Sequence, residues 1–377
     1  MWFLRLDTFV AIIAISLIMM LINFKKSNIP GKLRRVLLLC MNATLIFFVS
    51  FKLFLLYIIY SSLIFIMSRL MKYVPKYRKL VFIFGCILAV IPLFFIRFQT
   101  EVIDIIGLAF AVLRAIDVLF YAYFTEEEIE LLSYSNFMLF VPTFTAGPLF
   151  RFRDFSKELN NLKPVEIQDI VYSVKRIIRG FFKKVVIAQI FSQIFAHFSV
   201  DGTEYTLPIS FLLIICSYFI LYFDIAGYSD IAIGFGRICG FKVPENFKKP
   251  WFAASFTLFW RSWHSTVSDW IREHVFILVM NKKLNKITTG LLALGTMVIM
   301  SLWHGFSIPY LIAGIYNGAL LMVENVLQLT SPAKKRNFVW IVRCFAINFL
   351  FAINTLVFST TVGKTCDIIS GLFKLKG

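Results

Sequence analysis

The stretch Leu291-Leu-Ala-Leu-Gly-Thr-Met-Val-Ile-Met-Ser-Leu302 carries no charge and runs directly into Trp303-His304-Gly305. Such an apolar run predicts a segment that lies within a membrane or at its edge. An imidazole is costly to bury in hydrocarbon, so a histidine at that depth is a candidate functional residue. Few groups in the chain titrate near neutral pH, because it has only four histidines: His197, His264, His274 and His304.

The composition extends this prediction to the whole chain. Of its 377 residues 59% are apolar, and Phe alone occurs 44 times, whereas soluble proteins are about 45–50% apolar. The excess is spread along the sequence, which predicts an all-α polytopic membrane protein rather than a soluble domain with one anchor. We expect roughly 9–12 membrane segments, some of them short, because about 20 apolar residues cross a bilayer.

Basic residues near the N-terminus predict the topology. Between Thr8 and Thr100 there are twelve Lys or Arg and no Asp or Glu, and they cluster at 25–35 and 69–79. Cytoplasmic loops are rich in such residues, and two cytoplasmic loops require an even number of crossings between them. We therefore interpret Val36–Ser68 as two short crossings broken near Ser50–Lys52, with the N-terminus outside. One long tilted helix is the alternative.

The charge and the cysteines exclude several classes of protein. The basic residues flank apolar segments instead of forming one soluble face, which argues against nucleic-acid binding and favours contact with anionic lipid headgroups. The six cysteines form no CxxC pair, and no two histidines have the spacing of a helical zinc site. A haem held by two histidines has no supporting motif. We therefore predict no bound metal or cofactor, and we expect Phe9–Phe24 to be a retained first span.

Several polar features lie inside or beside apolar runs. Arg114 and Asp117 share one helical face and are expected to pair. The segment Pro142–Pro148 cannot continue a regular helix, so it either lines a funnel or simply ends a helix. Leu207–Phe223 is a predicted span that runs into Asp224-Ile-Ala-Gly-Tyr228-Ser-Asp230. That polar sequence is either a seam that packs helices or part of a substrate-binding surface.

Residues Val165–Lys184 predict a basic amphipathic helix on the inner surface of the membrane. Its apolar side carries Val174, Ile177, Ile178, Phe181 and Phe182, and its basic side carries Lys175, Arg176, Arg179, Lys183 and Lys184. Anionic lipids are suitable ligands for such a surface.

Two histidines are candidates for chemistry, because His264 and His304 each follow a tryptophan. A single histidine is more often a core residue than a catalyst. However, a GxSxG nucleophile motif and a glycine-rich phosphate loop are both absent from the sequence. Proton transfer by histidine in a shielded site is the chemistry that remains.

The motifs taken together resemble the membrane-bound O-acyltransferase family, and in particular its bacterial branch, which uses thioesters of carrier proteins. The resemblance covers Ile105–Leu321. It rests on the segments Gly107–Asp117, Pro142–Arg153, Phe223–Asp230, Pro244–Phe247, Phe259–His264 and Leu302–Gly305. The Pro-Thr at 142–143 suits the proteins that transfer D-alanine to teichoic acid, whereas Gly227–Asp230 is more similar to the alginate-type relatives.

The resemblance implies a ring of helices around a central funnel. It further implies that His304 is the catalytic base and that His264 is a second catalytic residue that orients the donor or polarises its carbonyl. Lower-ranked candidates for lining the substrate are Trp303, Trp263, Asp224, Tyr228, Asp230 and Pro148. The family core is expected at 105–330, preceded by membrane helices at 1–104 and followed by a helix and tail at 331–377.

The implied function is transfer of D-alanine from the phosphopantetheine thioester of a cytoplasmic carrier protein toward extracytoplasmic (lipo)teichoic acid. A membrane-anchored extracytoplasmic partner of the same pathway and a bacterial cell membrane are expected with it. O-acetylation of a surface polysaccharide, as in alginate or peptidoglycan, is the alternative. A proton-coupled transporter with a relay through His304, Asp224 and Asp230 is a more distant one, because the sequence has no inverted repeat.

Overall fold

The computed structural model describes residues 6–24, 29–98, 107–279, 285–329 and 337–374. Within these ranges the regular structure is helical, and the only β-type pairing is an isolated bridge between Phe24 and Val165. The all-α prediction is therefore confirmed. Lys25 and Lys26, which begin the basic cluster at 25–35, lie outside the described residues.

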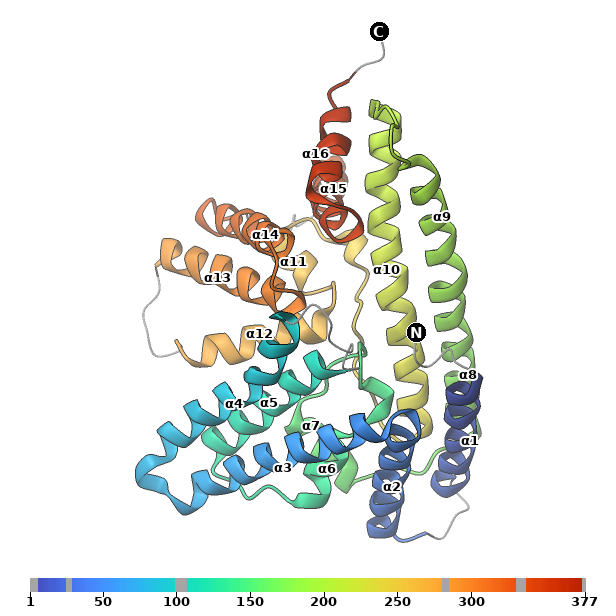
Figure 1. Ribbon diagram of the computed structural model, residues 1–377, viewed down its shortest axis with the longest axis vertical. Helices are drawn as coiled ribbons and strands as arrows, with labels where there is room; N and C mark the ends of the chain where they lie inside the picture. The colour runs from blue at the N-terminus through green and yellow to red at the C-terminus, as the bar shows by residue number, and fades with distance from the viewer. Residues whose placement is uncertain (1–5, 25–28, 99–106, 280–284, 330–336, 375–377) are drawn as a thin grey trace. The chain divides into compact units, whose positions relative to one another are not determined.

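The helices follow one another along the chain as labelled in Figure 1. They are α1 (Leu6–Asn23), α2 (Gly31–Val49), α3 (Phe51–Tyr73), α4 (Arg78–Phe98), α5 (Leu108–Thr125), α6 (Leu131–Met138), α7 (Phe152–Asn160), α8 (Ile167–Phe181), α9 (Ala188–Phe198), α10 (Leu207–Ile238), α11 (Phe256–Trp260), α12 (Ser265–Ile277), α13 (Lys286–His304), α14 (Ile308–Val326), α15 (Phe338–Ser359) and α16 (Val362–Gly371). A π-helical turn at Phe182–Ile187 joins α8 to α9.

The chain divides into two compact units. The first unit comprises Met1–Arg179 and Ser229–Pro244, and the second comprises Gly180–Tyr228 and Glu245–Gly377. The long helix α10 therefore contributes residues to both. The sequence predicted a family core at 105–330 between flanking segments at 1–104 and 331–377. Those bounds follow the motifs and stay a prediction.

Six helical segments among the described residues are long and apolar enough to cross a membrane. They are Phe51–Tyr73, Pro75–Phe94, Leu108–Thr125, Leu207–Ile238, Lys286–His304 and Phe338–Ser359. Large apolar side chains on their outer faces are exposed, such as Phe51 at 56% and Ile59 at 60%, as expected for surfaces that meet lipid. The protein is thus a multi-pass membrane protein. The expected total of nine to twelve segments includes shorter ones and stays a prediction.

A break at Ser50 separates α2 from α3, as predicted. Ser50 is extended (φ −167°, ψ 122°), and its hydroxyl accepts a hydrogen bond from the Leu53 N–H at 3.3 Å. A serine in this position caps the first turn of a helix, which has no backbone partner for its N–H groups. The alternative of one long tilted helix is therefore wrong.

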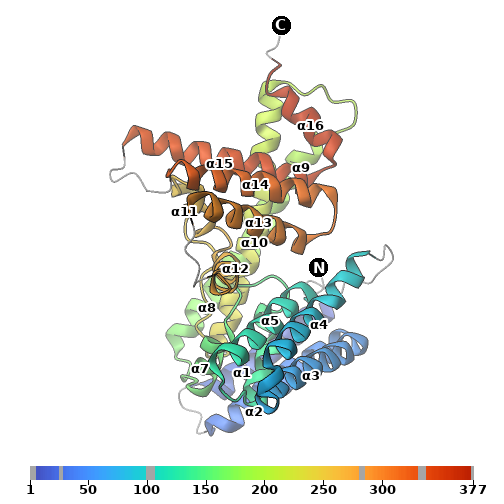
Figure 2. The same ribbon diagram turned by 90° about the vertical axis from the view of Figure 1, so that its left-hand side faces the viewer.

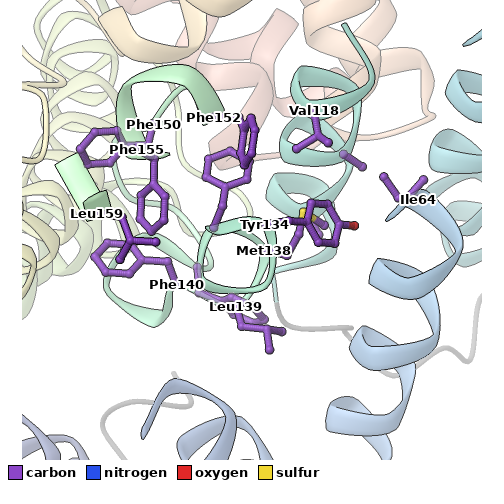
Figure 3. Close-up of a cluster of buried hydrophobic side chains, with 14 of the residues drawn as sticks. Ile64, Val118, Tyr134, Met138, Leu139, Phe140, Phe150, Phe152, Phe155 and Leu159 are labelled. Atoms are coloured by element: carbon purple, nitrogen blue, oxygen red, sulfur yellow. The ribbon is translucent and has the colours of Figure 1, made fainter. Parts of the chain in front are cut away.

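The core of the first unit is a hydrophobic cluster rich in aromatic side chains, part of which is drawn in Figure 3. Phe155 of α7 stacks on Phe241, with ring centroids 4.8 Å apart, and Phe140 packs edge-on against Phe155 at 5.2 Å. Tyr134 is buried in the same cluster and donates a hydrogen bond to the Ser61 carbonyl at 2.6 Å. These contacts attach the short helix α6 to α3 and pack α7 against the same cluster.

Arg114 holds the irregular segment that follows α6. Its buried guanidinium donates hydrogen bonds to the carbonyls of Phe137, Met138, Phe140 and Thr143, at 2.5–3.3 Å, and to the Thr143 hydroxyl at 2.8 Å. Asp117, one turn along α5, accepts from the Phe152 N–H at 2.6 Å. Helix α6 has already ended at Met138, before the prolines, so these two residues satisfy backbone groups that no helix pairs.

Basic residues of α8 and of the π-helical turn after it face α10, and so does Ile177 of the predicted apolar side, which packs against Gly234. In the first unit Arg176 bonds Asp230 at 2.5 Å, and in the second unit Lys184 pairs with Asp224. The apolar residues Val174, Ile178 and Phe182 are exposed, and the position of this helix on the inner surface of the membrane stays a prediction. Because its carboxylates are paired in this way, α10 continues through the polar sequence to Ile238.

Candidate active site

A cavity of about 270 Å³ lies within the second unit and contains both candidate histidines, His264 and His304. Helices α10, α11, α12, α13, α14 and α15 all contribute to its wall. Most lining residues are apolar or aromatic, and among the described residues that line it none is a carboxylate. Cavities of this kind, with a few polar groups, are the usual place for substrate.

His304 is the last residue of α13 and opens onto the cavity. Its ring meets Trp303 edge-on, with centroids 4.6 Å apart. Gly305 follows it because the ring of Tyr310, another lining residue, occupies the space of a side chain there. The hydroxyl of Ser301 also bonds the Tyr310 carbonyl at 2.5 Å. The sequence suggested a buried imidazole, but the side chain is exposed, so a substrate can reach it.

Close packing of α13 against α14 fixes the position of His304 along the cavity wall. The two helices run side by side (Figure 1, Figure 2). A Cβ atom on Gly314 would lie 2.8 Å from the Cα of Val298, so only glycine permits this approach. The last turn of α13 is therefore held against the wall formed by α14.

His264 occupies the corner between α11 and α12. Its backbone has a φ of +43°, a conformation that non-glycine residues seldom adopt and that is concentrated at functional sites. The preceding Trp263 is buried, stacks on Tyr218 with centroids 5.5 Å apart, and touches Phe351 at 4.8 Å. This aromatic packing anchors the corner and aims the imidazole at the cavity.

Asn246 selects one tautomer of His264. Its buried side-chain oxygen accepts from the Thr266 hydroxyl at 2.9 Å and faces the Thr266 N–H at 3.4 Å. Because a backbone N–H can only donate, the atom is an oxygen and not the amide nitrogen. The His264 Nδ1, 3.1 Å from that oxygen, must then carry a hydrogen. In the neutral ring Nε2 is left as an acceptor.

Desolvation of the ring, and to a lesser degree the positive charge of a protonated His304, lower the pKa of His264 from 6.5 to about 3. His264 lies outside the membrane-spanning helices. A histidine with so low a pKa stays neutral at physiological pH and is a weak base. It is therefore suited to accept a hydrogen bond at Nε2 and hold a group in place.

We expect the substitution Asn246→Asp to raise the pKa of His264. A carboxylate next to the Nδ1–H stabilises the imidazolium, so protonation begins at a higher pH in the variant. In NMR of histidine-labelled protein, the His264 signal of the wild type should not titrate between about pH 5 and pH 8, whereas that of the variant should. Asn246→Leu, which adds no charge, is the control. An unchanged titration in Asn246→Asp would contradict the assigned contact.

The structure brings together only part of the residue set predicted from the sequence. His264, His304 and Trp263 line the cavity, and Trp303 contacts His304. Asp224 pairs with Lys184, whose ammonium also lies 6.0 Å from the Tyr228 ring. Asp230 pairs with Arg176, and it belongs, like Pro148, to the first unit. The helix-packing interpretation of Asp224 and Asp230 therefore has direct support.

Three asparagines were not predicted: Asn246 beside His264, and Asn317 and Asn354, which line the cavity. The last two stand inside the apolar runs 308–327 and 338–358, and an amide in such a run is itself a signal of function. Within the described ranges no three His, Cys, Asp or Glu side chains are grouped to hold a metal ion, and the absence of a metal stays a prediction.

Comparisons with known proteins agree with the motifs. The model of the MBOAT, membrane-bound O-acyltransferase family, matches residues 124–362. The chain is 34% identical to a probable alginate O-acetylase of Pseudomonas fluorescens over 62% of its own length and 47% of that protein. It is 30% identical to a teichoic acid D-alanyltransferase of Streptococcus thermophilus, over 66% of its own length and 65% of that protein. A peptidoglycan O-acetyltransferase of Helicobacter pylori is 31% identical, over 52% of this chain and 37% of that protein.

The chain spans about half the length of the alginate relatives that it matches. The matched region 124–362 includes every residue that lines the cavity.

Proposed function

This chain belongs to the membrane-bound O-acyltransferase family, and we propose from that premise that it transfers an acyl group from a thioester to a hydroxyl acceptor. The observation that carries the proposal is the shared cavity of His264 and His304, because these residues come from two separate motifs. The acceptor is proposed to be a polymer of the bacterial cell surface, as the names of the relatives indicate for those proteins.

In the proposed reaction His304 is the general base. Its neutral imidazole takes the proton of the acceptor hydroxyl, and the oxygen attacks the thioester carbonyl. The new C–O bond forms, the C–S bond breaks, and the imidazolium returns the proton to the leaving thiolate. A thioester is already activated, so removal of this proton is the main requirement, and such general base catalysis contributes about 10²–10⁴-fold.

His264 is proposed to orient the donor by accepting a hydrogen bond. Polarising the thioester carbonyl would need a hydrogen on Nε2, which is the nitrogen left without one by the contact between Asn246 and Nδ1. Of the two roles considered from the sequence, orientation is therefore favoured.

The donor is proposed to be D-alanine on the phosphopantetheine thiol of a cytoplasmic carrier protein, with (lipo)teichoic acid as the destination. The D-alanyltransferase relatives and the Pro-Thr at 142–143 support this choice. Acetyl transfer is the second candidate, supported by the alginate O-acetylase relatives at 34% and 32% identity. A transporter relay is not supported, because Asp224 and Asp230 are each paired with a cation.

The proposal is tested with the protein purified into liposomes. A carrier protein loaded with radiolabelled D-alanine or acetate is supplied outside the liposomes, teichoic acid or a polysaccharide is enclosed inside them as acceptor, and ester-linked label is counted. Transfer of D-alanine to teichoic acid is the expected result. Transfer of acetate alone would establish the second candidate, and no transfer of either group would overturn acyl transfer from a carrier.

In this assay we expect His264→Ala to slow transfer, but less than removal of His304 does. The base is intact, and what is lost is the orientation of the donor, so KM for the loaded carrier should rise as kcat falls. His197→Ala is the matched control, because His197 is exposed on α9 and does not line the cavity. If His264→Ala is inactive while donor binding persists, the two histidines have the opposite roles.

A further inference from the structure

The cavity wall contains three buried polar atoms whose hydrogen bonding is incomplete. They are Oδ1 of Asn317, Oδ1 of Asn354 and Nε1 of Trp260, from α14, α15 and α11. The three residues are 5%, 4% and 8% exposed. Within the part of the chain that the structure describes, none of these three atoms has a hydrogen-bond partner.

Neighbouring bonds place the two asparagines together. The Asn317 Nδ2 donates to the Ala313 carbonyl at 2.9 Å, so the oxygen is the atom left over. The hydroxyl of Tyr316, the residue before Asn317, bonds the carbonyl of Leu350 at 2.9 Å, and Leu350 lies one turn before Asn354. The two amides therefore stand within about one helical turn of this contact between α14 and α15, and both residues line one cavity.

A buried acceptor without a donor destabilises the protein, because it has lost its water and gained no hydrogen bond in exchange. The cavity wall also includes Leu221, Ile225 and Val267, whose side chains carry no hydrogen-bond donor. The natural partner is a group of the substrate, which must bring N–H or O–H donors to the asparagines and an acceptor to the tryptophan.

Resting on the proposed function, we propose that Asn317 and Asn354 bind the amino group of an aminoacyl donor. An aminoacyl thioester offers N–H donors on its amino group and an acceptor on its carbonyl, which matches two amide oxygens and one indole N–H. An acetyl group has no donor and would leave both asparagines unpaired. The cavity is thereby selective for aminoacyl over plain acyl groups, and Trp260 donates to the carbonyl oxygen that both kinds of donor share.

The test compares two stable ligands on the detergent-solubilised full chain. They are the D-alanyl and propionyl ketone isosteres of the pantetheine thioesters, which differ only in the amino group. By calorimetry we expect the wild type to bind the D-alanyl isostere at least about 10-fold more tightly, the factor that about 1.4 kcal/mol gives. Asn317→Leu and Asn354→Leu should remove this preference and leave propionyl affinity unchanged. Trp260→Phe should weaken both ligands alike.

Asn325→Leu is the matched control. Asn325 is on the same helix and makes the same bond, from Nδ2 to the carbonyl four residues earlier, at 2.8 Å, but it does not line the cavity. Its substitution should leave the preference intact. Should a leucine variant fail to fold, Asn354→Asp replaces it, and its carboxylate should increase the preference for the amine.

Two results would overturn the proposal without touching acyl transfer. If the asparagine variants lose affinity for both isosteres equally, the amides bind the pantetheine arm that the two ligands share. If the preference for the D-alanyl isostere is unchanged, the amides bind water and not the amino group. If the wild type binds neither isostere, the thioester donor itself is wrong, and the proposed function fails together with this inference.

Discussion

Replacing His304 by alanine is expected to abolish acyl transfer from a loaded carrier while the protein stays folded in detergent. The side chain is exposed at the end of α13, so its removal leaves no core cavity. What is lost is the base, which contributes about 10²–10⁴-fold. The measurement is ester-linked label in liposomes, with the elution profile in detergent as the check on folding.

His304→Gln separates the base from the shape of the side chain. Glutamine fills similar space and forms hydrogen bonds, but it does not take up a proton near neutral pH, so it should be as inactive as alanine. Transfer retained by either variant in purified membranes would rule out His304 as the base. Deletion of the ring should also leave the Ser301 contact to Tyr310 in place, because it lies one turn away.

Arg114→Leu should strongly destabilise the first unit. The substitution leaves the carbonyls of Phe137, Met138, Phe140 and Thr143 without their donor. Each buried acceptor that loses its partner costs about 1–3 kcal/mol, so a total of about 3 kcal/mol or more is expected. The melting temperature of the detergent-solubilised protein should fall accordingly, and the yield of folded protein with it.

Arg153→Leu controls for the loss of a positive charge. The side chain of Arg153 is 72% exposed and pairs with its neighbour Asp154, and such surface pairs contribute about 0–1 kcal/mol. Its melting temperature should therefore match the wild type. If Arg114→Leu also melts like the wild type, the irregular segment after α6 is held by other contacts.

Local chemistry made much of the fold predictable. The break at Ser50 follows from a capping serine next to Lys52 between two apolar runs, and the structure places it there. The apolar runs 308–327 and 338–358 likewise coincide, to within one residue at each end, with α14 and α15. In each case a run of apolar residues is bounded by a charge, a glycine or a capping residue, so the signal is contained in adjacent positions.

The details that sequence reasoning missed depend on residues far apart in the chain. The extension of α10 to Ile238 relies on Lys184 and Arg176, at 40 and 54 residues from their carboxylates. The tautomer of His264 depends on Asn246, 18 residues earlier. Asn317 and Asn354 come together only because α14 packs on α15. None of these pairings has a local period or spacing that a single sequence displays.

The left-handed backbone of His264 also restricts which residues can replace it. Branched side chains such as Val, Ile and Thr clash at a φ of +43°, whereas asparagine tolerates that region of conformational space. Asparagine is also polar and planar, and its amide presents both a donor and an acceptor. The backbone conformation therefore limits which residues can replace His264 during evolution, independently of what the chemistry requires. Asparagine is a polar residue that this conformation allows.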